Sequence, residues 1–170
     1  MPVEDPSFLG SFIFFWGQKQ ETTHTWFSLF DEYGNKTEAV SVAEEIWKGK
    51  TLNFRGPKII NIFLSGKVAP DNIFLDPDEL QSAEIKVLQN TSGFSVIWEI
   101  YPEDWFKKNN VNNLIKPKIL KGLIIQQSGF KVRFKTPTAE GPYRLFSTVL
   151  DNKGNIATAN IPFYVIRSHE

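Results

Sequence analysis

The feature that most constrains this chain is a boundary at Arg55-Gly56-Pro57, where the spacing of apolar residues changes. Before the boundary, this spacing indicates one strand, one loop and one amphipathic helix. After it, the sequence indicates a series of short strands separated by turn residues. Residues 1–56 are too few for an ordinary domain, whereas residues 57–170 match the size of one β-sandwich. We therefore expect a mainly β protein, with a short βα segment over 1–56 and an immunoglobulin-like β-sandwich over 57–170.

The first segment contains one apolar run and one helical pattern. The run from Ser11 to Trp16 is almost entirely apolar, which is typical of a strand buried on both faces of a parallel sheet. Thr37 then precedes apolar residues at helical spacing up to Lys48, and Gly49 is placed to end the helix. Because one helix cannot cover both faces of such a strand, we expect this segment to dock on the sandwich or to form a homodimer.

Three stretches of the segment resemble the end of a TIM-barrel glycoside hydrolase: Gly10-Ser11-Phe12-Ile13-Phe14-Phe15-Trp16-Gly17-Gln18-Lys19-Gln20-Glu21, Thr25-Trp26-Phe27 and Lys36-Thr37-Glu38-Ala39-Val40. The resemblance is to bacterial glycoside hydrolase family 2-like proteins, whose barrel is followed by an immunoglobulin-like domain. It implies that residues 12–16 form the last barrel strand and that residues 37–48 form the last helix. Trp16 would then lie on the active-site face of the barrel.

The resemblance also implies which residues of the first segment contact sugar. Trp16 would be a platform under a sugar ring, with Gln18, Lys19 and Trp26 on the neighbouring loop. A simpler interpretation is that Trp16 fills the edge of a core, as most tryptophans do.

We expect no catalytic residue, metal or cofactor in this chain. Glycoside hydrolysis needs two carboxylates, and the barrel strands that carry them in enzymes of this kind are absent here. The chain has no cysteine, and nothing places His24 or His169 in a catalytic triad. The acidic residues that are the right type for calcium match no EF-hand spacing; they are Asp76, Asp78, Glu79 and Asp151.

The second segment carries eight strand patterns, at residues 58–64, 72–75, 83–89, 94–101, 119–126, 130–134, 143–150 and 156–166. Val96, Trp98 and Ile100 fall on one face of their strand, so we expect Trp98 to pack between two sheets. Tyr143 is expected to hydrogen-bond to the backbone at a corner of the sandwich.

A long polar loop is predicted between two strands of the second segment, over Pro102 to Lys118, and it contains Trp105 and Phe106. Loops of this length inside a domain are usually functional. Trp105 and Phe106 are therefore candidate carbohydrate contacts.

Charge and composition limit the partners. The 19 basic and 19 acidic residues cancel and the basic ones are scattered, so we expect no nucleic acid partner. The apolar run at residues 12–16 is too short to span a membrane. The N-terminus has Glu4 and Asp5 and lacks the basic start of a signal peptide, although the family that the chain resembles is secreted or periplasmic.

Aromatic residues make up 14% of the chain, which fits either a β-rich core or stacking on sugars.

Three hypotheses for function follow. The first is a C-terminal piece of a glycoside hydrolase that acts on polysaccharide, inactive alone, whose partner is the missing barrel. The second is a freestanding immunoglobulin-like module that binds carbohydrate or protein. The third is the product of a split or decayed gene whose neighbour encodes the barrel.

Overall fold

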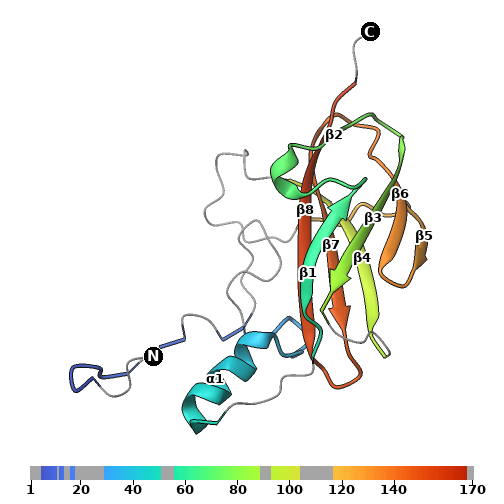
Figure 1. Ribbon diagram of the computed structural model, residues 1–170. Helices are drawn as coiled ribbons and strands as arrows, with labels where there is room; N and C mark the ends of the chain where they lie inside the picture. The colour runs from blue at the N-terminus through green and yellow to red at the C-terminus, as the bar shows by residue number, and fades with distance from the viewer. Residues whose placement is uncertain are drawn as a thin grey trace.

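Over the residues that it describes, the computed structural model contains two β-sheets packed face to face and one α-helix at one end of the sandwich (Figure 1). The structure describes residues 5–10, 12–13, 16–17, 29–50, 56–88, 93–103 and 117–167. The expectation of a mainly β protein built as a β-sandwich is confirmed.

The first sheet has four antiparallel strands in the order β1-β3-β6-β5. These strands are β1 (Ile59–Leu64), β3 (Leu80–Val87), β6 (Lys131–Lys135) and β5 (Ile124–Ser128). Because β1 and β5 lie at the two edges, β3 and β6 are the strands paired on both sides.

The second sheet also has four strands, in the order β2-β8-β7-β4. They are β2 (Phe74–Leu75), which follows a 3-10 helix at Ala69–Asp71, then β8 (Ile156–Val165), β7 (Gly141–Leu150) and β4 (Ser95–Pro102). Strand β2 runs parallel to β8, and the other pairs are antiparallel. The β7–β8 hairpin pairs over its whole length and forms the centre of this sheet.

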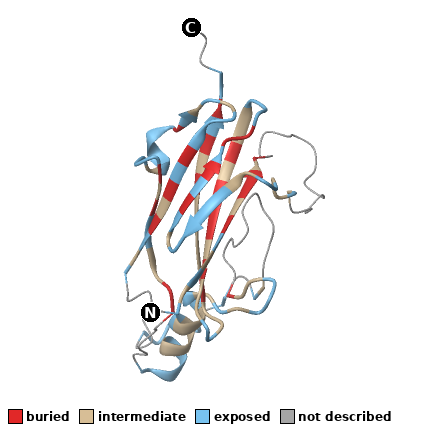
Figure 2. Cartoon of the chain, turned by 90° about the vertical axis from the view of Figure 1, so that its right-hand side faces the viewer, coloured by how far each residue is buried: buried red, intermediate tan, exposed pale blue. Residues whose placement is uncertain are grey.

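The core lies between the sheets and is built by alternation along the strands. Figure 2 shows buried bands alternating with exposed bands along the strands. In β4, Val96, Trp98 and Ile100 all face the core, as expected from their spacing. The rings of Phe134 and Phe163 meet across the two sheets at 6.0 Å between centroids.

Tyr143 closes a corner of the sandwich, as the sequence predicts. Its hydroxyl donates a hydrogen bond to the Ala139 carbonyl at 2.8 Å, and its ring stacks on Phe163 with centroids 5.8 Å apart. Burial raises the pKa of Tyr143 above its ordinary value. The ring and hydroxyl together connect the start of β7 to the core.

The helix α1 (Glu38–Lys48) forms where the sequence predicts it. Gly49 ends it in the left-handed conformation at φ 61°. The Thr37 hydroxyl does not cap the helix and instead donates to the Leu29 carbonyl at 3.0 Å. No residue of α1 is buried, so the helix projects from the end of the sandwich (Figure 1).

Two turns share the pattern Asp-X-X-Gly-Asn, at residues 31–35 and 151–155, and we call them the paired turns. In each, the aspartate carboxylate accepts hydrogen bonds from the backbone and side-chain N–H groups of the asparagine, at 2.7–2.9 Å. The glycines have φ of 82° and 75°, which other residues rarely adopt. The same local chemistry therefore folds both segments in the same way.

The paired turns lie side by side and attach residues 29–37 to the sandwich. Lys36 pairs in parallel with Asn155. The Lys36 N–H donates to the Gly154 carbonyl at 2.7 Å, and the Ile156 N–H donates to the Lys36 carbonyl at 2.9 Å. This part of the first segment therefore contacts the sandwich, which is one of the two arrangements expected from the sequence.

Acid should weaken the turn at 151–155. Burial opposes ionisation of Asp151, but hydrogen bonds from Asn155 and Lys153 outweigh it and hold the pKa below its ordinary value of 3.8. A carboxyl with a depressed folded-state pKa stabilises the fold above its unfolded-state pKa, and this stabilisation is lost as the pH falls through the folded-state pKa. We expect Asp151→Asn to lower the urea midpoint at neutral pH, and we expect its difference from the parent to shrink as the pH falls through the folded-state pKa of Asp151. A difference that does not change with pH would contradict this prediction.

The barrel strand expected at residues 12–16 is not formed by the residues described there. Phe12 is 100% exposed and Trp16 is 72% exposed, whereas a central barrel strand needs both faces covered. The Trp16 ring packs instead against Phe30, with centroids 5.2 Å apart. Within the described residues, the structure shows a sandwich and a helix and no end of a TIM barrel.

Candidate functional site

A shallow groove lies on the outer face of the β1-β3-β6-β5 sheet, and its volume is about 460 Å³. Its lining consists of Phe63, Gly66, Ser82, Ala83, Glu84, Gln126, Ser128, Lys131, Val132 and Arg133. Most of the polar side chains among them are exposed to solvent. The groove is therefore open to a ligand without any movement of the core.

Two rows of cross-strand neighbours form the floor of the groove. The first row, read from β1 to β5, is Phe63, Glu84, Lys131 and Ser128. The second row, read from β3 to β5, is Ser82, Arg133 and Gln126. Because neighbouring strands lie about 4.8 Å apart, each row presents hydrogen-bonding groups at short, regular intervals.

Alternation along β6 positions the groove's cations. Val132 and Phe134 are buried in the core, so Lys131, Arg133 and Lys135 point to the opposite face. The sequence predicts this strand at 130–134, but strand pattern alone does not say which strands lie beside it. Sequence reasoning therefore missed the groove, whose one visible signal was the alternation of basic and apolar residues.

The charges of the groove are only partly paired. Lys131 Nζ lies 3.4 Å from a Glu84 carboxylate oxygen. Lys86 Nζ lies 4.9 Å from the centre of the Phe63 ring, within reach of a cation–π interaction. Arg133 makes no ion pair or hydrogen bond within the described part of the chain. A free guanidinium thus lies in the second row of the groove.

This set of groups can bind a polar ligand and is poorly suited to hydrolysis. Serine hydroxyls and the Gln126 amide can donate and accept hydrogen bonds, and Phe63 offers an apolar surface. Glu84 is the single carboxylate among the described residues of the lining, whereas glycoside hydrolysis uses two. Across the described residues, no three acidic or histidine side chains gather as metal ligands would.

The outer face of the second sheet carries a different polar cluster. The Arg144 guanidinium donates to the Glu103 carboxylate and also to the Asn160 side-chain oxygen. The Glu103 side chain is almost completely buried, and that of Arg144 is mostly buried. Because these groups satisfy one another, the cluster supports the fold and offers little to a ligand.

Tyr101 and Phe146 are buried beside this cluster and meet edge to face, with centroids 5.5 Å apart. Burial, together with the Glu99 carboxylate that accepts its hydrogen bond, raises the pKa of Tyr101 well above its ordinary value. Glu32 of the first paired turn adds to this effect, so the turn lies near the sheet face.

The structure describes one of the candidate site residues from the sequence. Trp16 is described and contacts Phe30, and it does not line the groove. The others lie outside the described residues, so their positions stay predictions: Gln18, Lys19, Trp26, Trp105 and Phe106.

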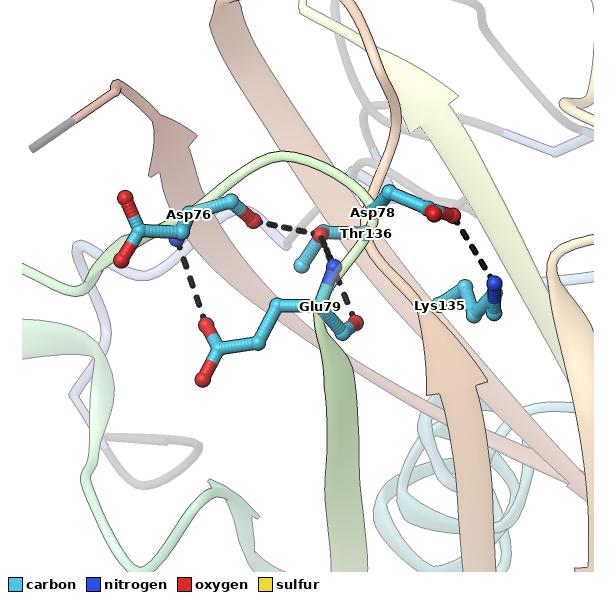
Figure 3. A network of polar contacts seen from close by, with 5 residues as sticks. All are labelled: Asp76, Asp78, Glu79, Lys135 and Thr136. Atoms are coloured by element: carbon cyan, nitrogen blue, oxygen red, sulfur yellow. Dashed lines mark hydrogen bonds and ion pairs between the residues drawn. The ribbon is translucent and has the colours of Figure 1, made fainter.

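The acidic loop before β3 is held by Thr136 (Figure 3). The buried Thr136 hydroxyl donates to the Asp76 carbonyl at 2.6 Å and accepts from the Glu79 N–H at 2.8 Å. Asp78 pairs with Lys135 Nζ at 3.0 Å. These acidic residues therefore form a turn and an ion pair, and they do not converge on a common point (Figure 3).

Replacing Thr136 with valine should destabilise the protein by about 1–3 kcal/mol, because it leaves the Asp76 carbonyl and the Glu79 N–H without their partner. Valine keeps the shape of the side chain, so the loss measures the hydrogen bonds. The matched control is Thr138→Val at an exposed position, for which we expect little change. Urea unfolding compares the two variants, and equal effects would contradict the prediction.

Comparison with known proteins finds distant structural similarity. CopC from Methylosinus trichosporium OB3b is 13% identical with a TM-score of 0.37, and the match covers 67% of this chain and 97% of that one. A superoxide reductase (neelaredoxin) from Ignicoccus hospitalis is 15% identical with a TM-score of 0.35, and the match covers 76% of this chain and 93% of that one. No family model and no curated protein matches the chain. Similarity at this level carries no argument about function.

These comparisons contradict the resemblance to the end of a bacterial TIM-barrel glycoside hydrolase. The two similar structures are not glycoside hydrolases, and no hydrolase family model matches. The exposed Phe12 and Trp16 agree with this correction, since the resemblance placed them in a buried strand. The description of the chain as a glycoside hydrolase fragment is therefore wrong.

Proposed function

We propose that this protein is a non-catalytic binding module, which holds a carbohydrate chain in the groove of the β1-β3-β6-β5 sheet. The observation that carries the proposal is the pair of polar rows on the groove floor, with Phe63 at the end of one row. Sugars carry hydroxyl groups at regular intervals together with apolar C–H faces. Side-chain donors and acceptors at fixed strand spacing, beside one aromatic ring, suit such a ligand.

The finer fold assignment belongs to the same proposal. When the two-residue strand β2 is left out of the count, β1, β3, β6 and β5 are the first, second, fifth and fourth strands, which share a sheet in immunoglobulin-like domains. The hydrogen bond from Tyr143 to the Ala139 carbonyl corresponds to the tyrosine corner of these domains. We infer an immunoglobulin-like module without the disulfide.

Affinity electrophoresis of the full chain tests the carbohydrate proposal. Gels contain either a neutral glucan, a xylan, a mannan or polygalacturonate, and retardation measures binding. We expect Phe63→Ala to weaken binding about tenfold, which corresponds to about 1.4 kcal/mol, because it removes the apolar surface that the ring offers to a sugar face. Phe74→Ala, which removes an exposed phenylalanine from the other sheet, is the matched control and should bind as the parent does. If no polymer retards the parent chain, the proposal is wrong.

A second candidate function is protein binding through the edge strand β5. This strand exposes Ile125 and carries no charged residue over Ile124–Ser128, and charges are the usual protection of a sheet edge. An extended peptide could therefore add to β5 as a further strand. Ile125→Lys should abolish capture of such a peptide and leave retardation in polysaccharide gels unchanged.

A further inference from the structure

The groove of the β1-β3-β6-β5 sheet has more positive than negative charge. Glu84 is the carboxylate in its lining, whereas Lys131 and Arg133 line it and Lys86 stands beside it over Phe63. The contact between Lys131 and Glu84 uses one cation of the three. The local excess is not visible in the composition, because the whole chain has zero net charge.

The uncompensated cations come from adjacent strands. Lys86 is on β3 and Arg133 is on β6, the strand paired with it. Among the described residues, no carboxylate is within ion-pair distance of either group, whereas the next outward cation, Lys135, is paired with Asp78 at 3.0 Å. Lys86 lies beyond the last β3–β6 pair, Glu84 with Lys131, whereas Arg133 lies in the second row, so the two cations stand on either side of the first row.

The chemistry of these groups favours an anionic ligand. The planar guanidinium of Arg133 can donate two parallel hydrogen bonds to one carboxylate, which a lysine ammonium cannot do. Arg133 and Lys86 are separated by the first row, so they can meet separate charges along a polymer. Repeated charge along a chain is a property of acidic polysaccharides.

We propose that the groove binds an acidic polysaccharide, with Arg133 and Lys86 contacting its carboxylates and the serine and glutamine side chains contacting its hydroxyls. This inference rests on the proposed carbohydrate-binding function of the same groove. Single-stranded nucleic acid also carries repeated negative charge, but its binding sites stack successive bases on several aromatic rings. Among the described residues, the groove lining has one aromatic residue, Phe63, and the polysaccharide is therefore the ligand we infer.

The test compares polygalacturonate with a neutral glucan and a single-stranded oligonucleotide, using the full chain in titration calorimetry. We expect polygalacturonate to bind at least about tenfold more tightly than the glucan and the oligonucleotide, and to bind more weakly as salt is raised from about 50 to about 200 mM. Arg133→Gln should reduce polygalacturonate affinity about tenfold, the effect of losing charge-assisted hydrogen bonds, and should make that affinity less dependent on salt.

Arg167→Gln is the matched control, because it removes an exposed arginine beyond the end of β8. Equal losses in the Arg133 and Arg167 variants would overturn the inference, as would equal affinity for acidic and neutral polymers. Preference for the oligonucleotide would also overturn it. Binding of the neutral glucan alone would leave the proposed function intact and reject the acidic ligand, whereas no binding to any polysaccharide would reject both.

Discussion

Replacing Arg144 with methionine should destabilise the protein by about 3–5 kcal/mol, because the change leaves the Glu103 carboxylate buried without a partner. Asn160 would lose a donor to its side-chain oxygen in the same variant. Methionine keeps most of the length of the arginine side chain, so packing changes little. Urea unfolding at neutral pH measures the loss.

Two further variants test whether the loss of stability comes from breaking the buried pair. Arg167→Met removes an arginine from an exposed position and should change stability by less than about 0.5 kcal/mol. The double variant Arg144→Met/Glu103→Leu should recover much of the stability, since a buried pair replaced by apolar residues is often close to neutral. If the double variant were less stable than Arg144→Met alone, the unpaired carboxylate would not be the cause.

Phe163→Ala should cost about 3–5 kcal/mol, the usual effect of removing a buried aromatic ring. Phe163 is 1% exposed and its ring contacts both Phe134 of the other sheet and Tyr143 at the corner. The cavity left by alanine would therefore weaken the contact between the sheets. Phe74→Ala removes the same ring from a position that is 58% exposed on the same sheet.

We expect Phe74→Ala to stay within about 1 kcal/mol of the parent, so the difference between the two variants measures burial. Thermal unfolding followed by circular dichroism checks both. Similar midpoints for the two variants would mean that the core does not depend on Phe163.

Local signals in the sequence were sufficient for the helix and for most strands. Thr37 and Gly49 bracket α1 as predicted, since helix ends depend on nearby residues. Strand ends were less predictable because they depend on distant partners. The strand expected at 119–126 is found at Ile124–Ser128, since the Leu120 N–H donates instead to the Ile100 carbonyl of the other sheet.

The groove could not be predicted from strand patterns, because it depends on which strands are neighbours. Ser82, Arg133 and Gln126 form one row only because β3, β6 and β5 are adjacent. Sequence reasoning instead offered aromatic residues such as Trp16 as candidate sugar contacts. An aromatic residue is visible in a sequence wherever it lies, whereas a cross-strand row becomes visible only when the register is known.

The paired turns also have a consequence for folding kinetics. Lys36, directly after the first turn, pairs with Asn155 of the second turn. These residues are far apart in the sequence, so their contact has a high loop-closure cost and is expected to form late. Residues 29–37 attach to the β7–β8 hairpin, and the turn of that hairpin can form without them. In native-state hydrogen exchange, the Lys36 amide should therefore open with a lower free energy than the amides in the middle of β7.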